Sequence, residues 1–535
     1  MKLGIDFGTT RIVVAAVDRG NFPVVTFDSP SGHVHDWFPP LIAVRGQERL
    51  YGWEAWDAQV EPQVTVVRSL KRVLEDAGPA TRVQIGQQKL TLIDLLTEMM
   101  AALAKALRES SSLQIEPGEE IEIMLGVPAN ANSNQRYLTV EPAQRAGFRV
   151  LGLLNEPTAA SIEYGHRTKG TGKSERVLVY DLGGGTFDVS LVEVEDRTHQ
   201  VVASEGISTL GGDDFDVILA EAALAEAGLT LDELTQKEIF LLAEECRVRK
   251  EALHPNTKRV IVDLGNVRET FPEVGVPVDE YYEFCTPLVE RTAEVTRNLL
   301  DQHAEGKRLD ALYITGGGSE LPLVARLLRE DFGRKVKRSS HTRSATAIGL
   351  AIQADAQSGY VLRERFSRHF GVWREAEGGK NVVFDVLFSK GTVLPGPGEP
   401  PIAIKRGYWP VHNLGHFRFL ESSFRDESGR PSGDITLWDE IQFPFDPSLH
   451  GHELSSVPVL HSEAARQQLI EEQYECDARG GVRVVIRNRT AGYEQEFRLG
   501  RWTAPPEPIV PGRRRHNNRP AGSSRSQRAG GAMRN

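Results

Sequence analysis

A hairpin pattern that occurs twice constrains the fold of this chain more than any other feature. In the first copy an apolar segment ends in Asp6, and a Gly/Thr turn leads into a second apolar run at 12–17. After 175 residues the same pattern returns around Asp181, followed by the apolar run 189–194. A hairpin repeated at this distance predicts two similar subdomains that face each other across a cleft.

The segments around these hairpins indicate an α/β fold. Apolar segments bounded by turn residues predict strands at 3–5, 12–17, 121–127, 176–180, 189–194, 259–262 and 311–314. Apolar residues at helical spacing predict helices at 92–107, 237–253 and 323–330. A further helix is predicted at 287–303, with Thr286 as its N-cap and Pro287 in its first turn. Helices that alternate with strands in this way cover the faces of sheets.

The sequence changes in character after about residue 360. Short alternating segments between Gly, Pro and Asn turns predict strands at 382–388, 402–406, 416–421, 435–445 and 482–488. From residue 503 the chain is rich in Pro, Arg, Ser and Gly, which predicts a disordered tail. We therefore expect an α/β domain at 1–355, a linker at 356–369, an all-β sandwich domain at 370–502 and a disordered basic tail at 503–535.

Composition and charge exclude several classes of protein. With 535 residues, 40% of them hydrophobic, a wholly disordered chain is excluded. No apolar run reaches the roughly 20 residues of a membrane span, and Asp6 interrupts the N-terminal apolar run that a signal peptide needs. Three scattered cysteines predict a reducing, cytoplasmic compartment.

The net charge of −11 hides a contrast, because residues 505–535 carry seven Arg and one Glu. The acidic remainder argues against nucleic-acid binding except through this tail. The tail is either an electrostatic tether or a solvated chain end.

The two turns have the chemistry of a phosphate site. Glycine lets the backbone approach an anion closely, and turn N–H groups with Thr hydroxyls can cradle phosphate oxygens. Two facing carboxylates beside phosphates suit a Mg²⁺ ion that keeps several waters. One such turn alone is as consistent with an ordinary hairpin, whereas two in register favour a nucleotide. A third glycine turn before the helix at 323–330 adds an anion-binding helix N-terminus. The candidate residues are Asp6, Gly8, Thr9, Thr10, Asp181, Gly183, Gly184, Gly185, Thr186, Gly316, Gly317 and Gly318.

Six motifs follow one another in the α/β part of the chain. They are IDFGTT at 5–10, RSLKRV at 68–73, GVPA at 126–129 with Gln135 and Arg136, NEPTAA at 155–160, DLGGGTFD at 181–188 and LGGDDFD at 210–216. In this order they make residues 1–355 resemble the nucleotide-binding domain of the heat-shock 70 kDa (DnaK-type) chaperones, within the actin/hexokinase-like ATPase superfamily. The resemblance implies a two-lobed actin-like (ribonuclease-H-like) ATPase domain that binds ATP or ADP.

The resemblance also implies a role for individual residues. Asp6 and Asp181 would hold Mg²⁺ through waters, and Asp188 would lie beside a K⁺ ion. Lys71 and Glu156 would act at the transferred phosphate and the metal's water shell, although Lys71 taken alone is an ordinary surface lysine. Thr186 would orient the nucleophile, and Gly212 and Lys250 would contact the nucleotide. Pro128 and Arg136 would form the interdomain switch.

The sequence departs from the family on the adenosine side. Arg247 stands where the family has Glu, Glu320 where it has Arg, and Thr342-Arg343 where it has Pro-Asp. We expect Arg343 to stack on the base while Glu320 pairs with it. Affinity and base preference are therefore less constrained by the resemblance than the phosphate chemistry.

Residues 366–500 resemble the family's substrate-binding β-sandwich, whose groove binds extended polypeptide. A generic β-sandwich is the alternative, and no pocket residues can be placed. The segment 360–368 lacks the family's acidic-leucine linker, and no long helical pattern for a lid follows the β-domain.

Three functions are consistent with these features. The first is a slow ATPase chaperone that binds unfolded polypeptide, with a J-domain co-chaperone and a nucleotide exchange factor as implied partners. The second is a nucleotide-gated module for one dedicated protein partner. The third, a small-molecule kinase of the same superfamily, fits the chaperone-type motifs less well.

Overall fold

The computed structural model describes residues 1–499 except 62, 69, 75–76, 79, 169–173, 304–305, 378–380, 396–398 and 478–479. The tail expected at 503–535 therefore lies outside the described residues. No helix in the described part of the chain is both long and apolar enough to cross a membrane.

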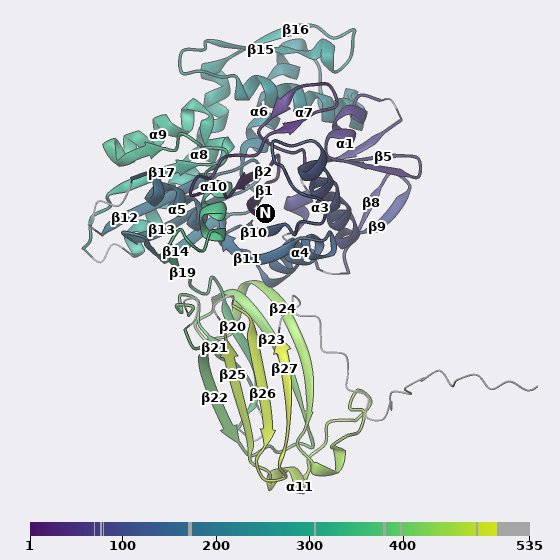
Figure 1. Cartoon of the computed structure of the whole chain (residues 1–535), viewed down its shortest axis with the longest axis vertical. Helices are drawn as coiled ribbons and strands as arrows, with labels where there is room; N and C mark the ends of the chain where they lie inside the picture. Colours follow the sequence, from purple (N-terminus) through teal and green to yellow (C-terminus); the bar gives the residue numbers. More distant parts are fainter. Residues whose placement is uncertain are drawn as a thin grey trace, which may run out of the picture. The chain divides into compact units, whose positions relative to one another are not determined.

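Two sheets of the α/β part repeat one topology (Figure 1). The first, ordered β11-β10-β1-β2, contains β1 (Lys2–Phe7), β2 (Ile12–Ala16), β10 (Glu122–Val127) and β11 (Arg149–Asn155). The second, ordered β18-β17-β12-β13-β14-β19, contains β12 (Glu175–Leu182), β13 (Phe187–Glu195), β14 (Thr198–Ile207), β17 (Ala311–Thr315), β18 (Val336–Arg338) and β19 (Val361–Arg363).

The repeated hairpin lies at the same place in both sheets. β1 pairs antiparallel with β2 and parallel with β10, and β12 pairs antiparallel with β13 and parallel with β17. The duplication predicted from two short motifs thus extends to the neighbouring strand in each sheet.

Short strands complete the α/β part. They are β3 (Phe27–Asp28), β4 (Val34–His35), β5 (Ile42–Arg45), β6 (Glu48–Tyr51), β7 (Thr65–Val67), β8 (Arg82–Ile85), β9 (Gln88–Thr91), β15 (Arg259–Asp263) and β16 (Glu273–Pro277).

The helices cover the sheets with apolar faces. They are α1 (Trp53–Ala58), α2 (Leu70–Val73), α3 (Leu92–Glu109), α4 (Ser133–Arg145), α5 (Glu156–Thr168), α6 (Gly212–Ala227), α7 (Gln236–Glu251), α8 (Val278–Gln302), α9 (Pro322–Phe332) and α10 (Ala345–Ala354). Short 3₁₀ helices are η1 (Leu231–Glu233), η2 (Leu264–Asn266), η3 (Gly317–Glu320) and η4 (Gly333–Lys335).

The start predicted for the helix at 287–303 is wrong. α8 begins at Val278, and Pro287 lies inside it rather than in its first turn. The buried side chains of Tyr281 and Cys285 continue the apolar face toward the N-terminus. Burial of that face outweighs the one backbone hydrogen bond that an internal proline removes.

Helices α5 and α10 pack very closely between the two sheets. A Cβ on Gly349 of α10 would clash with the carbonyl group of Ala159 of α5. Because α5 begins at Glu156, this contact fixes the first turn of α5, where a candidate site residue lies.

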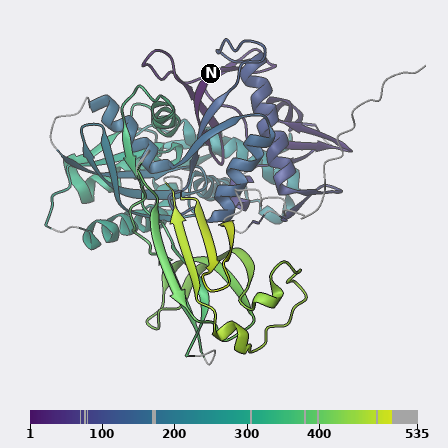
Figure 2. The same ribbon diagram turned by 60° about the horizontal axis from the view of Figure 1, so that its bottom comes forward.

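The β-domain is a sandwich of two four-stranded sheets (Figures 1 and 2). One sheet, ordered β21-β20-β23-β24, contains β20 (His369–Ala376), β21 (Asn381–Phe388), β23 (Leu414–Arg425) and β24 (Pro431–Pro444). The other, ordered β22-β25-β26-β27, contains β22 (Ile402–Tyr408), β25 (Ile470–Cys476), β26 (Val482–Asn488) and β27 (Tyr493–Leu499).

Phenylalanines fill the core of the sandwich, with Phe370, Phe388, Phe419 and Phe443 fully buried. The long connection between β24 and β25 carries η5 (Pro447–Leu449) and α11 (Glu463–Arg466), as the turned view shows (Figure 2).

The segment expected as a linker, 356–369, contains β19, a strand of the α/β part. β19 pairs in parallel with β14, which adds it to the edge of the second sheet. Glu364, next in the chain, accepts hydrogen bonds from the backbone N–H and the side-chain amide of Asn155. The domain boundaries expected at 355, 369 and 502 stay predictions.

Candidate active site

Three glycine turns meet at one cavity between the duplicated hairpins. The cavity measures about 110 Å³. A Cβ on Gly318 would lie 2.5 Å from the carbonyl oxygen of Gly183, and Gly316 has a φ of 84°. The N–H of Gly212 donates to the same Gly183 oxygen at 2.9 Å. Only glycine permits this approach, so the turns form a backbone cradle of the kind that holds phosphates.

Most of the candidate residues line this cavity together. They are Asp6, Gly8, Thr9, Thr10, Lys71, Glu156, Asp181, Gly183, Gly184, Thr186, Gly212, Lys250, Gly316, Gly317, Gly318 and Arg343. Their functional roles stay predictions.

Four candidates lie outside it. Gly185 packs where a Cβ would clash with Thr9 and Arg72. Asp188 accepts a hydrogen bond from the N–H of Ala129 at 3.0 Å, and Pro128 lines a second cavity beside it. Arg136 donates to the side chain of Asn155 at 3.0 Å.

Buried carboxylates surround a single lysine at one end of the cavity. Lys71 of α2 donates to the Glu156 carboxylate at the start of α5. Burial, and next the charge of Glu156, raise the pKa of Asp6 to about 8 and of Asp181 and Asp188 to about 7. For Lys71, burial lowers the pKa, but Glu156 and Asp6 reverse this and raise it above its ordinary value.

The described residues contain no group of three or more His, Cys, Asp or Glu side chains arranged to hold a metal ion directly, so these carboxylates suit a hard divalent cation that is held through its waters. Burial removes the carboxylates from water and the charge of Glu156 adds repulsion, which Lys71 offsets only in part, so the pKa values of Asp6 and Asp181 rise. A bound cation would return these groups to their ionised state. Oxygen donors of this kind suit Mg²⁺, and Asp6 and Asp181 are the residues that would hold it.

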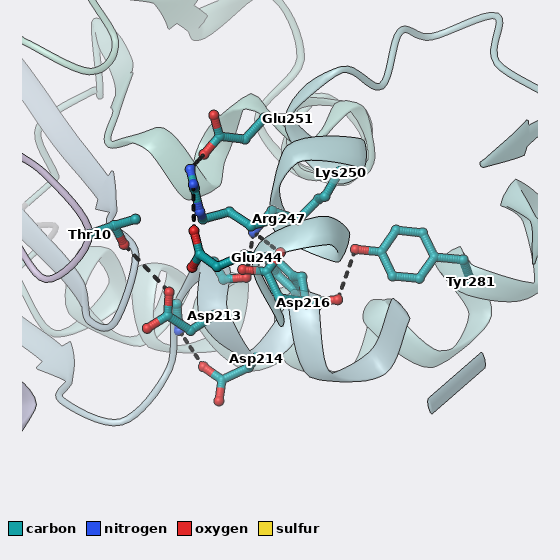
Figure 3. Close-up of polar contacts among 12 residues, drawn as sticks. Thr10, Asp213, Asp214, Asp216, Glu244, Arg247, Lys250, Glu251 and Tyr281 are labelled. Atoms are coloured by element: carbon teal, nitrogen blue, oxygen red, sulfur yellow. Dashed lines mark hydrogen bonds and ion pairs between the residues drawn. The ribbon is translucent and has the colours of Figure 1, made fainter. Parts of the chain in front are cut away.

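A network of ion pairs occupies the opposite end of the cavity (Figure 3). Lys250 of α7 contacts Asp216 at 2.7 Å and donates to the carbonyl of Gly212 at 2.6 Å. Arg247 donates to Glu244 at 2.9 Å and to Glu251 at 3.3 Å. The lysine expected near the nucleotide is therefore already bound to α6.

Glu251 links the two sides of the cleft. It accepts hydrogen bonds from Arg11, which follows the first phosphate turn, and from Arg343 at 3.1 Å. Burial alone would raise the pKa of Glu251, but Arg11, Arg343 and Arg247 lower it to about 2. Arg343 also donates to Glu320 at 2.7 Å. The expected pairing of Arg343 with Glu320 is present, and stacking on adenine stays a prediction.

The sequence interpretation missed Arg11 and Glu251. Each directly follows a residue that was selected, Thr10 and Lys250, so proximity in the chain was the available signal. Their ion pairs explain why the cavity is smaller than the about 300–1,000 Å³ of typical ligand pockets.

A separate pocket of about 440 Å³, the β-domain pocket, lies at the ends of β20, β22 and β23. Its lining includes charged side chains such as Arg374, Glu375 and Arg406, and five large aromatic ones: Trp373, Tyr408, Trp409, Phe417 and Phe445. Trp409 is 66% exposed, and Val459 beside it is 46% exposed. No motif in the sequence indicates that these residues meet.

Ion pairs hold two arginines that line this β-domain pocket, Arg374 and Arg406. Arg374 donates to Glu472 at 2.5 and 3.0 Å and to Asp385 at 2.7 Å. Asp385 in turn accepts two bonds from Arg406 at 2.9 Å. Glu472 is fully buried, so the pairing neutralises charge that would otherwise be costly to bury.

A duplicated α/β fold with paired phosphate-type turns, followed by a β-sandwich, is the architecture of an Hsp70-type two-lobed ATPase domain joined to a β-sandwich domain. Residues 2–366 match the family model described as Hsp70 protein, and the chain belongs to that family.

Curated relatives extend the similarity beyond the matched region. A protein described as chaperone protein HscA homolog from Methylibium petroleiphilum is 30% identical over 513 residues, covering 92% of this chain and 77% of the relative. Proteins with the same description from Burkholderia cenocepacia and Burkholderia mallei are 30% and 29% identical with the same coverage. The family and these relatives support a chaperone of the Hsp70 type.

Proposed function

We propose that this protein is a cytoplasmic chaperone that binds and slowly hydrolyses ATP, and that its β-domain binds extended polypeptide. The observation that carries the ATPase proposal is the Lys71–Glu156 pair among buried carboxylates, at the end of a cavity formed by three glycine turns. Positioning a water and neutralising charge on the phosphoryl group is most of what such catalysis requires.

Each residue of this group has a distinct role in the proposal. Lys71 contacts the transferred phosphate, and Glu156 holds its ammonium group in place. The Thr186 hydroxyl orients the attacking water. Asp6 and Asp181 hold Mg²⁺ through waters, and Asp188 lies beside K⁺. The Mg²⁺ ion, when bound, supplies charge neutralisation for the phosphates.

The β-domain pocket is the proposed polypeptide site. An extended peptide can bond to the exposed edges of strands while its apolar side chains enter an aromatic cavity. Trp409, exposed at the rim, is the side chain best placed to cover such a peptide.

Contacts between the nucleotide domain and the segment after β19 support coupling of the two sites. Asn155 binds Glu364 of that segment and precedes Glu156 in the chain. Arg136 binds the same Asn155 side chain. A change at Lys71 and Glu156 can therefore reach Glu364 through one residue, despite the altered linker sequence.

ATP turnover by the full-length protein tests the proposal. Lys71→Ala and Thr186→Ala should each lower turnover by about 100-fold or more, with ATP binding largely retained. Wild-type turnover should rise when an unfolded polypeptide is added. Turnover equal to wild type in both variants would contradict the proposed ATPase activity.

A dedicated protein partner is a second candidate for the β-domain. The charged side chains that line the pocket, Arg374, Glu375 and Arg406, favour one sequence over a range of apolar peptides. A pull-down distinguishes the two, since many unfolded clients support the chaperone and one stoichiometric protein supports the module. A J-domain protein and a nucleotide exchange factor are the proposed co-chaperones.

A further inference from the structure

A second cavity lies directly behind the proposed catalytic lysine. It measures about 210 Å³ and shares two lining residues, Lys71 and Thr186, with the nucleotide cleft. Asp188 also lines it. We refer to it as the rear chamber. The phosphate end of the nucleotide site is thus bordered by the cleft on one side and by the rear chamber on the other.

Three parts of the chain form the remaining walls. The segment before α4 and its first turn contribute Pro128, Asn130, Ala131 and Gln135, and the end of β14 contributes residues 205–208. The β-domain and the segment leading to it contribute Ser367, Arg368, Lys390, Ser423, Phe424 and Asp434.

Two ionic contacts join these walls. Lys390, after β21, donates to Glu205 of β14 at 3.0 Å, and its ammonium group lies 5.1 Å from the ring centroid of Phe424. Arg368 binds Asp434 and the carbonyl oxygen of Asn130, the latter at 3.3 Å. The Lys390–Glu205 pair is partly solvent-exposed on both sides, which places it between the rear chamber and solvent.

The lining suits a small anion. Four cationic side chains border the rear chamber, at positions 71, 72, 368 and 390, and they pair in turn with the carboxylates of Glu156, Asp214, Asp434 and Glu205. The ammonium and guanidinium groups of these side chains offer a phosphate ion hydrogen-bond donors along this route.

We propose that the inorganic phosphate formed by ATP hydrolysis leaves through the rear chamber, and that the Lys390–Glu205 pair limits its rate of escape. The inference rests on the proposed ATPase function. ADP would still fill the cleft after hydrolysis, so the cleft side of Lys71 and Thr186 is closed to the phosphate. The other side opens into the rear chamber, and β-domain residues form its outer wall. Position of the β-domain would then regulate phosphate release.

Trapping of ADP by orthovanadate tests this route without requiring hydrolysis. Vanadate has the shape and charge of phosphate, and with ADP in the cleft it must reach Lys71 from behind. Full-length protein is loaded with a fluorescent ADP analogue and Mg²⁺, and vanadate is added. The rate of trapping is read from the growth of a slowly dissociating ADP fraction. ADP dissociation without vanadate is measured in parallel.

Glu205→Gln and Lys390→Met each break the pair from one side. Both should speed vanadate trapping about two- to fivefold, the range expected for loss of a partly exposed ion pair, with ADP dissociation unchanged. The matched control is Glu399→Gln, which breaks the exposed Arg363–Glu399 pair outside the rear chamber and should trap at the wild-type rate.

Slower trapping in Lys390→Met, or rates equal to the control in both variants, would overturn the inference. Failure of the proposed function has a different signature, which is absence of ATP cleavage by the wild-type protein in a single-turnover assay. A folded state for each variant is checked by its ADP affinity.

Discussion

The nucleotide cleft is formed around backbone turns, whereas the β-domain pocket is lined by large side chains. The cleft is lined by backbone turns in which glycines at 183, 212 and 318 approach one another. The β-domain pocket is lined by large side chains on separate strands, such as Trp373 and Phe417. Where backbone segments of the cradle approach this closely, no atom can be added, whereas a side-chain pocket can be remodelled residue by residue. Substitutions can therefore change the ligand of the β-domain pocket more readily than the chemistry of the cleft.

The largest expected effect comes from adding one methyl group to the cleft. Gly318→Ala places a Cβ 2.5 Å from the Gly183 carbonyl oxygen, so the turns must separate. We expect ATP affinity to fall about 100-fold or more, because displaced N–H groups no longer meet the phosphates. Titration with a fluorescent ATP analogue measures this.

The same turn supplies the control. A Cβ on Gly317 would have its nearest neighbour at 3.9 Å, on Arg343. Gly317→Ala should therefore bind ATP within about threefold of wild type, since an ordinary van der Waals contact causes no displacement. Equal losses in both variants would mean that general flexibility, rather than the close approach, matters here.

The β-domain pocket should respond to truncation rather than addition. Trp409→Ala removes an exposed ring from the pocket rim, and we expect peptide affinity to fall about tenfold or more, as for aromatic anchors at interfaces. Fluorescence anisotropy with a labelled apolar peptide measures this. Basal ATP turnover should remain at the wild-type level.

Val382→Ala is the matched control for Trp409→Ala. Val382 is also exposed, at 57%, but it lies on β21 outside the pocket. Peptide affinity should be unchanged in this variant. If both substitutions weaken binding equally, the peptide site is elsewhere on the β-domain.

This difference in construction explains what the sequence could predict. In the cleft, carboxylate, glycine and hydroxyl groups stand within a few residues of one another, as from Asp181 to Thr186. Groups that are close in the chain there are therefore also close in space. The duplicated hairpin extended this reasoning to the pairing of whole sheets.

Long-range pairings were beyond such reasoning. Arg11 and Glu251 are 240 positions apart and meet only because α7 folds over the first turn. The β-domain pocket depends on the register of β20, β22 and β23. The error at α8 has a local cause, since Pro287 resembles a helix start when the buried face of Tyr281 and Cys285 is not known.

A smaller effect is expected where ion pairs close the cleft. Glu251→Gln weakens the contacts that hold Arg11 and Arg343 across the cavity. We expect ATP to associate about fivefold faster, the scale of a partly exposed ion pair. Stopped-flow binding measures this, with Glu399→Gln as a control remote from the cleft. An unchanged association rate would show that the cleft opens without breaking these pairs.

The smallest expected effect is the pH dependence of the free energy of unfolding that Glu251 contributes through its ion pairs. The pKa of Glu251 is about 2 in the folded protein, below its ordinary value of 4.5. A carboxylate with a depressed pKa stabilises the fold above its ordinary pKa, and this stabilisation is lost as pH falls from 4.5 toward 2. Wild type should exceed Glu251→Gln in free energy of unfolding by on the order of 1 kcal/mol at pH 7, and by less at pH 3.5. Urea unfolding at several pH values measures the gap.

The carboxylates at Asp6 and Asp181 have raised pKa values and change stability in the opposite direction, but they are common to both proteins and cancel in the difference. A gap that stays constant with pH would mean that Glu251 contributes by packing rather than by charge.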